Sequence, residues 1–189
     1  MSLRRIAYCL KMERIFLIGY MGCGKSTIGK RLAKSLSLSF IDLDVHIQNK
    51  YRKSIAELFA GKGEEEFRRI ERQALLEVAT FEDVLISTGG GAPCFFDNME
   101  VMNRAGITIY IQANPEELAA RLRASKTVRP LLREKKPEEL VPFIREHLAE
   151  RERYYKNAQI IFPTDHLITK EEIQLTVDAI AERLKNRNR

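Results

Sequence analysis

The sequence predicts an α/β fold in which helices cover both faces of a parallel β-sheet. Five short apolar segments alternate along the chain with segments whose apolar residues have helical spacing. This alternation is typical of parallel sheets, because each connection between parallel strands must cross a face of the sheet. Motifs rich in glycine or charge follow the predicted strands, and ligands bind beyond the carboxyl ends of strands in such folds. With 189 residues, the chain is long enough for one such domain.

Each predicted element follows from a local pattern. Residues 14–18 form a short apolar run that leads into a glycine-rich segment, and helical spacing starts directly after that segment. Pro115 suits the first turn of a helix, where its missing N–H group has no partner to lose. The predicted strands are residues 14–18, 39–41, 83–87, 107–111 and 159–162. The predicted helices are residues 26–36, 44–50, 55–59, 64–79, 115–123, 137–156 and 170–185.

The composition is that of a soluble globular protein with an excess of positive charge. Hydrophobic residues make up 44% of the chain, charged residues make up 31%, and the formal net charge is +6. No apolar run approaches the roughly 18 to 20 residues that a membrane span needs, so we expect no membrane partner. The chain has no nucleic-acid-binding motif, so anionic small molecules explain the charge better than nucleic acid does. Three scattered cysteines favour a reducing, cytoplasmic location.

The first eleven residues stand apart from the rest. Basic residues flank a short apolar patch there, but the patch is too short for a signal peptide and no small-residue cleavage site follows it. We interpret residues 1–11 as an N-terminal extension or an artificial leader, with Met12 as an alternative start. Residues 12–189 are then expected to form a single domain.

Residues 19–26 read GYMGCGKS and fit the pattern G-x4-G-K-[ST]. The glycines allow tight backbone conformations, so that successive N–H groups and the start of the next helix can surround phosphate oxygens. Lys25 is expected to reach the transferred phosphate, and Ser26 to place its hydroxyl on Mg²⁺. The motif follows a predicted strand and opens a predicted helix, which is the context that a phosphate-binding loop (P-loop) requires. We therefore predict a site for a nucleoside triphosphate with magnesium, in which Cys23 has no chemical role.

Three further motifs lie at the same predicted edge of the sheet or on the helix beside it. Asp42 and Asp44 follow the second strand, where one carboxylate can reach magnesium and the other a substrate hydroxyl; a helix-capping aspartate beside a surface aspartate is the alternative. Arg68 and Glu71 share a helix face. Either Arg68 binds a carboxylate with its planar guanidinium group while Glu71 holds it in place, or the two residues form a surface ion pair. Three consecutive glycines at residues 89–91 indicate close approach of a ligand to the backbone, with a plain loop as the alternative.

Taken together, these motifs resemble the shikimate kinase family. The resemblance extends along nearly the whole chain from Arg14 onward, and it depends on the combination of motifs more than on the phosphate loop alone. It implies a P-loop NTPase fold of the nucleoside-monophosphate-kinase type: three α/β/α layers, a five-stranded parallel sheet in the order 2-3-1-4-5 and a mobile lid. It also implies transfer of the ATP γ-phosphate to the 3-hydroxyl of shikimate, in chorismate and aromatic amino-acid synthesis. The matching motifs are residues 19–26, Asp42-x-Asp44, Phe67-Arg68-x-x-Glu71, Gly89-Gly90-Gly91 and Arg129-Pro130-Leu131-Leu132.

The resemblance assigns the nucleotide side of the site. Lys25 would contact the β- and γ-phosphates, and Ser26 with Asp42 would hold Mg²⁺. Arg129 would reach toward the phosphates from a lid at about residues 125–136, a polar, basic segment that also fits an ordinary solvated loop. The nucleotide-binding residues implied are Gly22, Cys23, Gly24, Lys25, Ser26, Thr27, Arg129 and, packing against adenine, Arg123.

The resemblance also assigns the acceptor side. Asp44 would orient or deprotonate the attacking hydroxyl, and Arg68 would bind the shikimate carboxylate. Gly89, Gly90 and Gly91 would line the substrate, with Gly90 donating its backbone N–H. A second substrate arginine is expected before a tyrosine of the late helix; the spacing favours Arg151, with Arg153 as the alternative. We expect a monomer that binds shikimate and ATP.

Two other functions fit part of the pattern. A related small-molecule kinase, acting on gluconate or a nucleotide, would share the cradle and the fold. A P-loop module that binds nucleotide without turnover is the second alternative, but such a module need not keep Asp44, Arg68 and Arg129. GTPases are disfavoured, because the chain has no base-reading N/TKxD motif.

Overall fold

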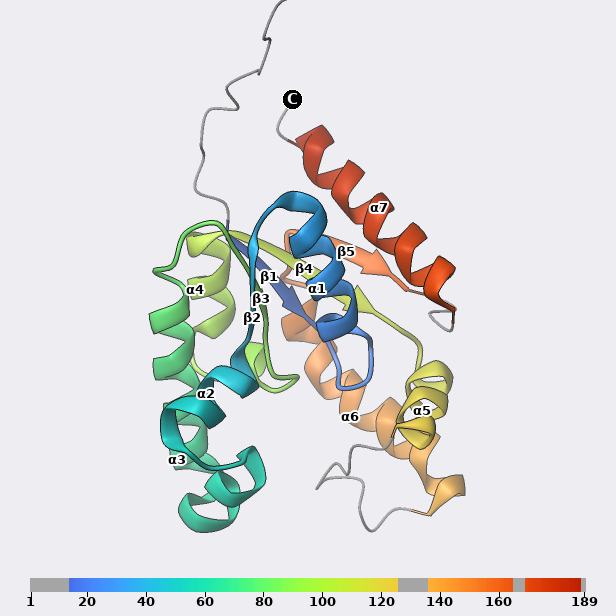
Figure 1. The fold of residues 1–189 in the computed structure, drawn as a ribbon. Helices are drawn as coiled ribbons and strands as arrows, with labels where there is room; N and C mark the ends of the chain where they lie inside the picture. The colour runs from blue at the N-terminus through green and yellow to red at the C-terminus, as the bar shows by residue number, and fades with distance from the viewer. Residues whose placement is uncertain (1–13, 126–135, 165–168, 188–189) are drawn as a thin grey trace, which may run out of the picture.

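A computed structural model describes residues 14–125, 136–164 and 169–187. Its centre is a parallel sheet in the order β2-β3-β1-β4-β5, which confirms the predicted order (Figure 1). β1 lies in the middle, with Leu17 opposite Ser87 of β3 and Ile109 of β4. Because all five strands are parallel, their carboxyl ends meet at one edge of the sheet. The strands are β1 (Arg14–Ile18), β2 (Ser39–Asp42), β3 (Val84–Ser87), β4 (Ile107–Gln112) and β5 (Ile160–Pro163).

Helices cover both faces of the sheet and complete the predicted three layers. α1 and α7 pack against each other on one face, while α6 lies behind the sheet in the view of Figure 1. α2 and α3 lie on one side of the carboxyl edge and α5 on the other. The helices are α1 (Lys25–Leu36), α2 (Leu43–Tyr51), α3 (Ile55–Val78), α4 (Asn98–Ala105), α5 (Pro115–Ala124), α6 (Leu140–Tyr155) and α7 (Lys170–Arg187), with short 3₁₀ turns η1 (Ala92–Cys94) and η3 (Pro137–Glu139).

Two helical segments differ from the prediction. The helices expected over residues 55–59 and 64–79 follow one another as α3, with a kink at Gly63, where φ is 77° and ψ is 170°. Ser54 and Glu57 form a capping box that fixes where α3 begins. α4 was not predicted, because it has eight residues and buries only Asn98, Met99 and Met102.

The core is formed by the central strands and the helix faces against them. Every residue of β3 is buried, as are the last four residues of β1. The packing of α1 against the sheet requires a glycine at residue 29, since a Cβ atom there would lie 2.6 Å from the Phe40 ring. α1 therefore lies close to the sheet and holds the loop before it in a fixed position.

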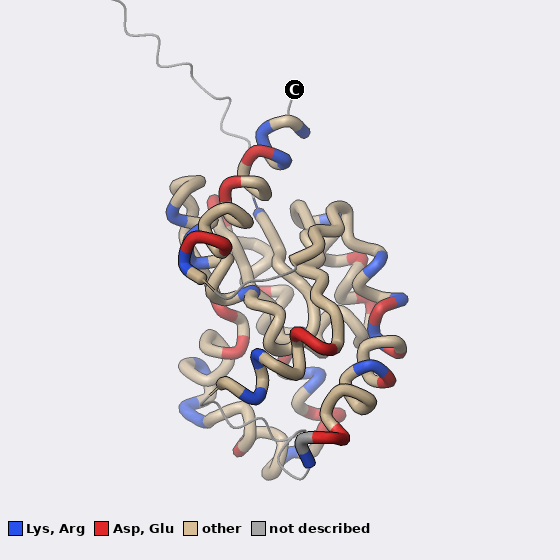
Figure 2. The backbone as a smooth tube through the Cα atoms, turned by 90° about the vertical axis from the view of Figure 1, so that its right-hand side faces the viewer, with Lys and Arg blue, Asp and Glu red and all other residues tan. Residues whose placement is uncertain are grey.

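The charged residues are spread over the outer helices. In the view of Figure 2, Lys and Arg alternate with Asp and Glu along these helices. None of the helices in the described ranges is long and apolar enough to cross a membrane. The single domain over residues 12–189 stays a prediction, and residues 1–11 and most of the expected lid lie outside the described residues.

Candidate active site

The predicted phosphate loop joins β1 to α1 at the centre of the carboxyl edge. Gly19, Gly22 and Gly24 have φ values of 140°, 80° and 99°, which L-residues with side chains rarely adopt. A Cβ atom on Gly19 would also lie 2.6 Å from the carbonyl oxygen of Ile111. The strand, the glycine loop and the helix are thus arranged as an anion cradle at a helix N-terminus.

Lys25 is the first residue of α1, and its side chain turns back over this loop. Its Nζ atom donates to the carbonyl oxygens of Gly19 at 2.8 Å and Tyr20 at 2.9 Å. The residue is 8% exposed, so little water competes for its charge. The ammonium group is therefore held against the loop and contributes its positive charge to the cavity in front of it.

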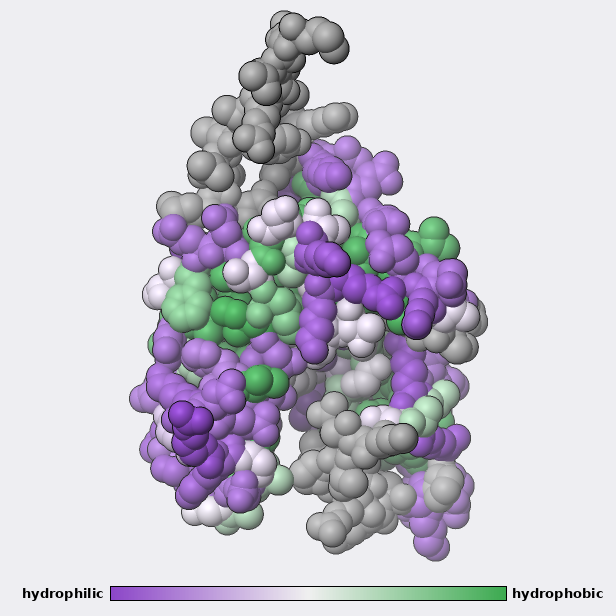
Figure 3. All heavy atoms as spheres, viewed as in Figure 1, coloured by the Kyte–Doolittle hydropathy of each residue, from purple (hydrophilic) through white to green (hydrophobic). Residues whose placement is uncertain are grey.

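A cavity of about 280 Å³ opens in front of the loop. Figure 3 shows the molecule hollowed between the α2–α3 side and the α5–α6 side. The cavity wall comes from the loop, the start of α1, the ends of β2 and β3, and the end of α5. Of the predicted residues, it contains Gly22, Gly24, Lys25, Ser26, Thr27, Asp42, Asp44, Gly89 and Gly90.

Asp42 connects the loop to the start of α2. Its Oδ2 atom accepts a hydrogen bond of 2.7 Å from Ser26, and its Oδ1 atom accepts from the N–H groups of Asp44 and Val45. Asp42 therefore caps α2, as the alternative interpretation had it. The same carboxylate forms a pair of hard oxygen donors with the Ser26 hydroxyl, which is a donor set that Mg²⁺ accepts together with phosphate and water.

Asp44 and Glu71 approach the same glycine. A Cβ atom on Gly89 would lie 3.0 Å from Asp44 Oδ1 and 2.8 Å from Glu71 Oε1. The two carboxylate oxygens are thus within 5.8 Å of each other, and a side chain at residue 89 would displace them. Gly89 is required for this close approach.

Arg68 lies beside the other end of the glycine segment and is held on several sides. Its guanidinium group pairs with Glu71 at 2.9 Å and with Glu64 at 3.1 Å, and it lies 4.1 Å from the centre of the Phe95 ring. A Cβ atom on Gly91 would meet the guanidinium nitrogens at 2.6 and 2.8 Å. Since Arg68 is only 8% exposed, the surface ion-pair alternative is wrong.

Glu71 is the most perturbed carboxylate of the described part of the site. It is 1% exposed, and burial raises its pKa to about 7 against the attraction of Arg68. Asp44 raises this pKa further, whereas the positive charge of Arg151 lowers it. The protonation state of Glu71 can therefore change near neutral pH.

The structure separates the two candidates for the second arginine. Arg151 lies near the glycine segment, 3.7 Å from a Cβ position on Gly90, and 5.8 Å from the centre of the Tyr20 ring. Arg153 is exposed and stacks on its neighbour Tyr154. The geometry therefore favours Arg151.

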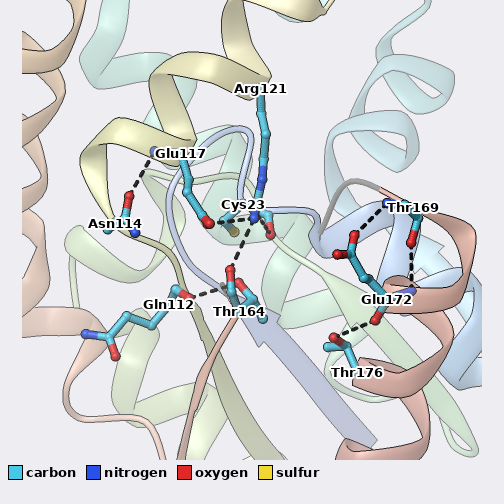
Figure 4. A network of polar contacts seen from close by, with 9 residues as sticks. All are labelled: Cys23, Gln112, Asn114, Glu117, Arg121, Thr164, Thr169, Glu172 and Thr176. Carbon is cyan, nitrogen blue, oxygen red and sulfur yellow. Dashed lines mark hydrogen bonds and ion pairs between the residues drawn. The ribbon is translucent and has the colours of Figure 1, made fainter. Parts of the chain in front are cut away.

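Arg121 is a residue that the sequence reasoning overlooked. Figure 4 shows it bridging three elements: it donates to the carbonyl oxygens of Cys23 and Thr164 and pairs with Glu117 at 2.8 Å. Arg121 also lines the cavity, whereas Arg123, the predicted adenine neighbour, does not. The one sequence feature that distinguishes the two arginines is their position around the helix, because residues 121 and 123 lie about 200° apart and cannot face the same side.

Four other predicted residues of the described chain do not line this cavity: Cys23, Arg68, Gly91 and Arg151. Cys23 is fully buried beneath the loop, which agrees with its having no chemical role. Arg129 lies outside the described residues, and so does most of the lid that would carry it.

The cradle, Asp44 and the first two glycines of the Gly89–Gly91 segment line one cavity at the carboxyl edge, and Arg68 and Arg151 lie beside that glycine segment. Such an arrangement suits transfer of a phosphoryl group to a small anionic acceptor, because that reaction needs positioning and charge neutralisation. The fold and the site thus define a P-loop kinase.

Comparison with known proteins identifies the family. A family model described as shikimate kinase matches residues 21–185. A shikimate kinase of Parabacteroides distasonis is 54% identical over 162 residues, which cover 86% of this chain and 94% of that protein. The chain belongs to the shikimate kinase family, as its motifs predicted.

Solved structures agree with this assignment. The crystal structure of a shikimate kinase from Bacteroides thetaiotaomicron has a TM-score of 0.89 and 49% identity, covering 92% of this chain and 99% of that one. A shikimate kinase from Acinetobacter baumannii, solved in complex with shikimate, has a TM-score of 0.82 and 29% identity, covering 95% and 97% of the two chains. The predicted fold is confirmed.

Proposed function

We propose that this chain transfers the γ-phosphate of ATP to the 3-hydroxyl of shikimate, a step of chorismate and aromatic amino-acid synthesis. The observation that carries the proposal is the placement of Asp44 and Arg68 at opposite ends of the Gly89–Gly91 backbone, of which Gly89 and Gly90 line the same cavity as the phosphate cradle. A ring with a hydroxyl at one end and a carboxylate at the other matches that spacing of charges. The shikimate complex of the relative from Acinetobacter baumannii supports the same acceptor.

Each side of the proposed site has a physical task. Lys25 and the loop N–H groups hold the β- and γ-phosphates, and the lysine charge offsets the negative charge that spreads over the equatorial oxygens. Ser26 and Asp42 would hold Mg²⁺, which, when bound, neutralises phosphate charge. Asp44 accepts a hydrogen bond from the attacking hydroxyl and takes its proton. Arg68 and Arg151 orient the acceptor through its carboxylate.

An assay of ADP release tests the function. Shikimate, gluconate and nucleoside monophosphates are compared as acceptors under the same ATP and Mg²⁺ conditions. We expect activity with shikimate to exceed that with the other acceptors by about a hundredfold or more, because the shikimate ring holds its carboxylate and its hydroxyl at a fixed separation, whereas gluconate is a flexible open chain and a nucleoside monophosphate has no carboxylate. Higher activity with gluconate or a nucleotide would favour the related-kinase alternative, and nucleotide binding without turnover would favour a binding module.

The pKa of Glu71 predicts a pH dependence of shikimate binding. Protonated Glu71 leaves the charges of Arg68 and Arg151 free for the substrate carboxylate, and the bound carboxylate in turn favours the protonated form. Affinity should therefore be highest below the pKa of about 7 and fall as pH rises through it, by roughly fivefold between pH 6 and 8. Calorimetric titration of shikimate at several pH values measures this.

The Glu71→Gln variant is the control for this prediction. Glutamine keeps the shape and a hydrogen-bond acceptor for Arg68 but cannot titrate, so the pH dependence should flatten. Calorimetry in two buffers with different ionisation enthalpies should show proton uptake with the wild type and none with the variant. A variant with the full wild-type pH slope would assign the titration to another group.

The remaining proposals concern the oligomeric state and the cellular location of the protein. We propose that the protein acts as a monomer, since the described residues of a single chain supply both the phosphate cradle and the acceptor side chains Asp44, Arg68 and Arg151. We also propose a cytoplasmic location, because the scattered cysteines suit a reducing compartment. Size-exclusion chromatography with light scattering tests the monomer.

A further inference from the structure

The phenol group of Tyr155 lies at the centre of the acceptor side but has no role in the proposed function. Tyr155 is the last residue of α6 and is fully buried. Its Oη atom donates a hydrogen bond of 2.6 Å to the carbonyl oxygen of Gly90. Burial raises the pKa of Tyr155 well above its ordinary value, so the hydroxyl stays protonated and remains a donor.

This bond fixes the orientation of one peptide group in the glycine segment. The carbonyl of Gly90 and the N–H of Gly91 belong to the same trans peptide, so they point in opposite directions. With the carbonyl held toward α6, the N–H of Gly91 is turned away from it. Glycines have many accessible conformations, so without an anchor this peptide would be free to rotate.

The same hydroxyl lies close to Arg151, one helical turn earlier in α6. Both groups lie against Gly90, since the hydroxyl bonds to its carbonyl oxygen and a Cβ atom on Gly90 would lie 3.7 Å from Arg151 Nη1; the charge of Arg151 accordingly lowers the pKa of Tyr155 against the effect of burial. Because the hydroxyl proton is used in the bond to Gly90, a lone pair is left to face the guanidinium group. Tyr155 thus connects the arginine and the glycine that the proposed function places around the acceptor.

The glycine segment also lies against the phosphate loop. A Cβ atom on Gly90 would lie 3.3 Å from the backbone nitrogen of Met21 and 3.5 Å from the carbonyl oxygen of Gly19. A shift of Gly90 would therefore change the distance between the acceptor and the phosphates. Its carbonyl anchor is at the point where both halves of the site meet.

We propose that Tyr155 is a positioning residue, whose hydroxyl holds the Gly90–Gly91 peptide and the Arg151 guanidinium in the geometry that binds the acceptor. The role of the acceptor rests on the proposed function. Tyr155 does not touch the reacting atoms; it acts through the two groups that do contact the substrate.

The chain supplies a matched control for the test. The Tyr110 ring lies tilted against that of Tyr155, with 5.0 Å between ring centres, and is also buried. Its hydroxyl has no hydrogen-bond partner within the described ranges of the chain. Tyr155→Phe and Tyr110→Phe thus each remove one buried hydroxyl from the same ring pair, but only the first breaks the bond to Gly90.

Steady-state kinetics with both substrates distinguish the two variants. For Tyr155→Phe we expect the KM for shikimate to rise about tenfold, with kcat and the KM for ATP changed less than about threefold. Calorimetry without ATP should show the same loss of shikimate affinity. Tyr110→Phe should leave all three constants within about twofold of wild type.

The outcomes separate this proposal from the proposed function. Wild-type protein without shikimate-dependent ADP release would count against the function itself. With an active wild type, a shikimate KM of Tyr155→Phe within twofold of that of Tyr110→Phe would overturn the positioning role. Equal losses for ATP and shikimate, together with a lowered melting temperature, would also overturn it, because they would show a general loss of structure.

Discussion

Replacing Asp44 by asparagine is expected to lower kcat by about a hundredfold to ten-thousandfold. The side chain keeps its size but loses its negative charge and its ability to take a proton from the acceptor hydroxyl. Asp44 lines the same cavity as Lys25 and lies beside Gly89, so it is placed to contact a hydroxyl that attacks a phosphate held in this cavity. Steady-state ADP release measures the effect, and shikimate affinity by calorimetry should change far less than kcat.

Asp42→Asn is the matched control, because Asp42 lies two residues away on the same cavity wall. Its carboxylate accepts from Ser26 and caps α2, so its loss should mainly weaken magnesium binding. Raising the Mg²⁺ concentration should therefore restore much of the activity of Asp42→Asn and little of that of Asp44→Asn. Recovery of both variants at high Mg²⁺ would place Asp44 in the metal site and not beside the acceptor.

The strands and the phosphate loop could be predicted from the sequence because their signals are local. Apolar runs indicate the strands, and the glycines of residues 19–26 indicate where the loop backbone adopts positive φ values. α4 was missed because it buries little and its apolar positions are few. Two helices were predicted on either side of residues 60–63, and a loop was expected between them, because no local pattern indicates that the helices follow one another with only a kink at Gly63.

The candidate site could be predicted only in part, because the spacing of residues along the chain does not show how deeply their side chains are buried. The Arg68–Glu71 spacing fits an exposed ion pair as well as a buried one, and only tertiary packing against Phe95 and the glycines decides between them. The roles of Asp42 were given as alternatives, yet its two oxygens allow capping and contact with Ser26 at once. Arg121 was overlooked because its contacts outside α5 are with the backbone carbonyls of Cys23 and Thr164, which carry no sequence signal, and its i,i+4 pair with Glu117 resembles an ordinary helix-surface pair.

The largest effect on acceptor binding is expected from Arg68→Lys. Lysine keeps the charge but cannot form a planar fork with a carboxylate, and it is too compact to span Glu64, Glu71 and the substrate together. We expect the dissociation constant of shikimate to rise by about fiftyfold or more, corresponding to loss of a charge-assisted hydrogen bond worth roughly 2 to 3 kcal/mol. Calorimetry measures the affinity, and nucleotide affinity should be unchanged.

Lysine is preferable to alanine for this test, since alanine would leave Glu71 buried without its partner, which costs about 3 to 5 kcal/mol of stability. Arg69→Lys is the control one position along α3, because the Arg69 side chain is 59% exposed and pairs only with Glu65 and Glu66 in the described structure. That variant should bind shikimate as the wild type does, because exposed ion pairs contribute little. Wild-type shikimate affinity in Arg68→Lys would exclude Arg68 as the carboxylate ligand and leave Arg151 as the remaining candidate, because it is the other guanidinium group that the described structure places beside the glycine segment.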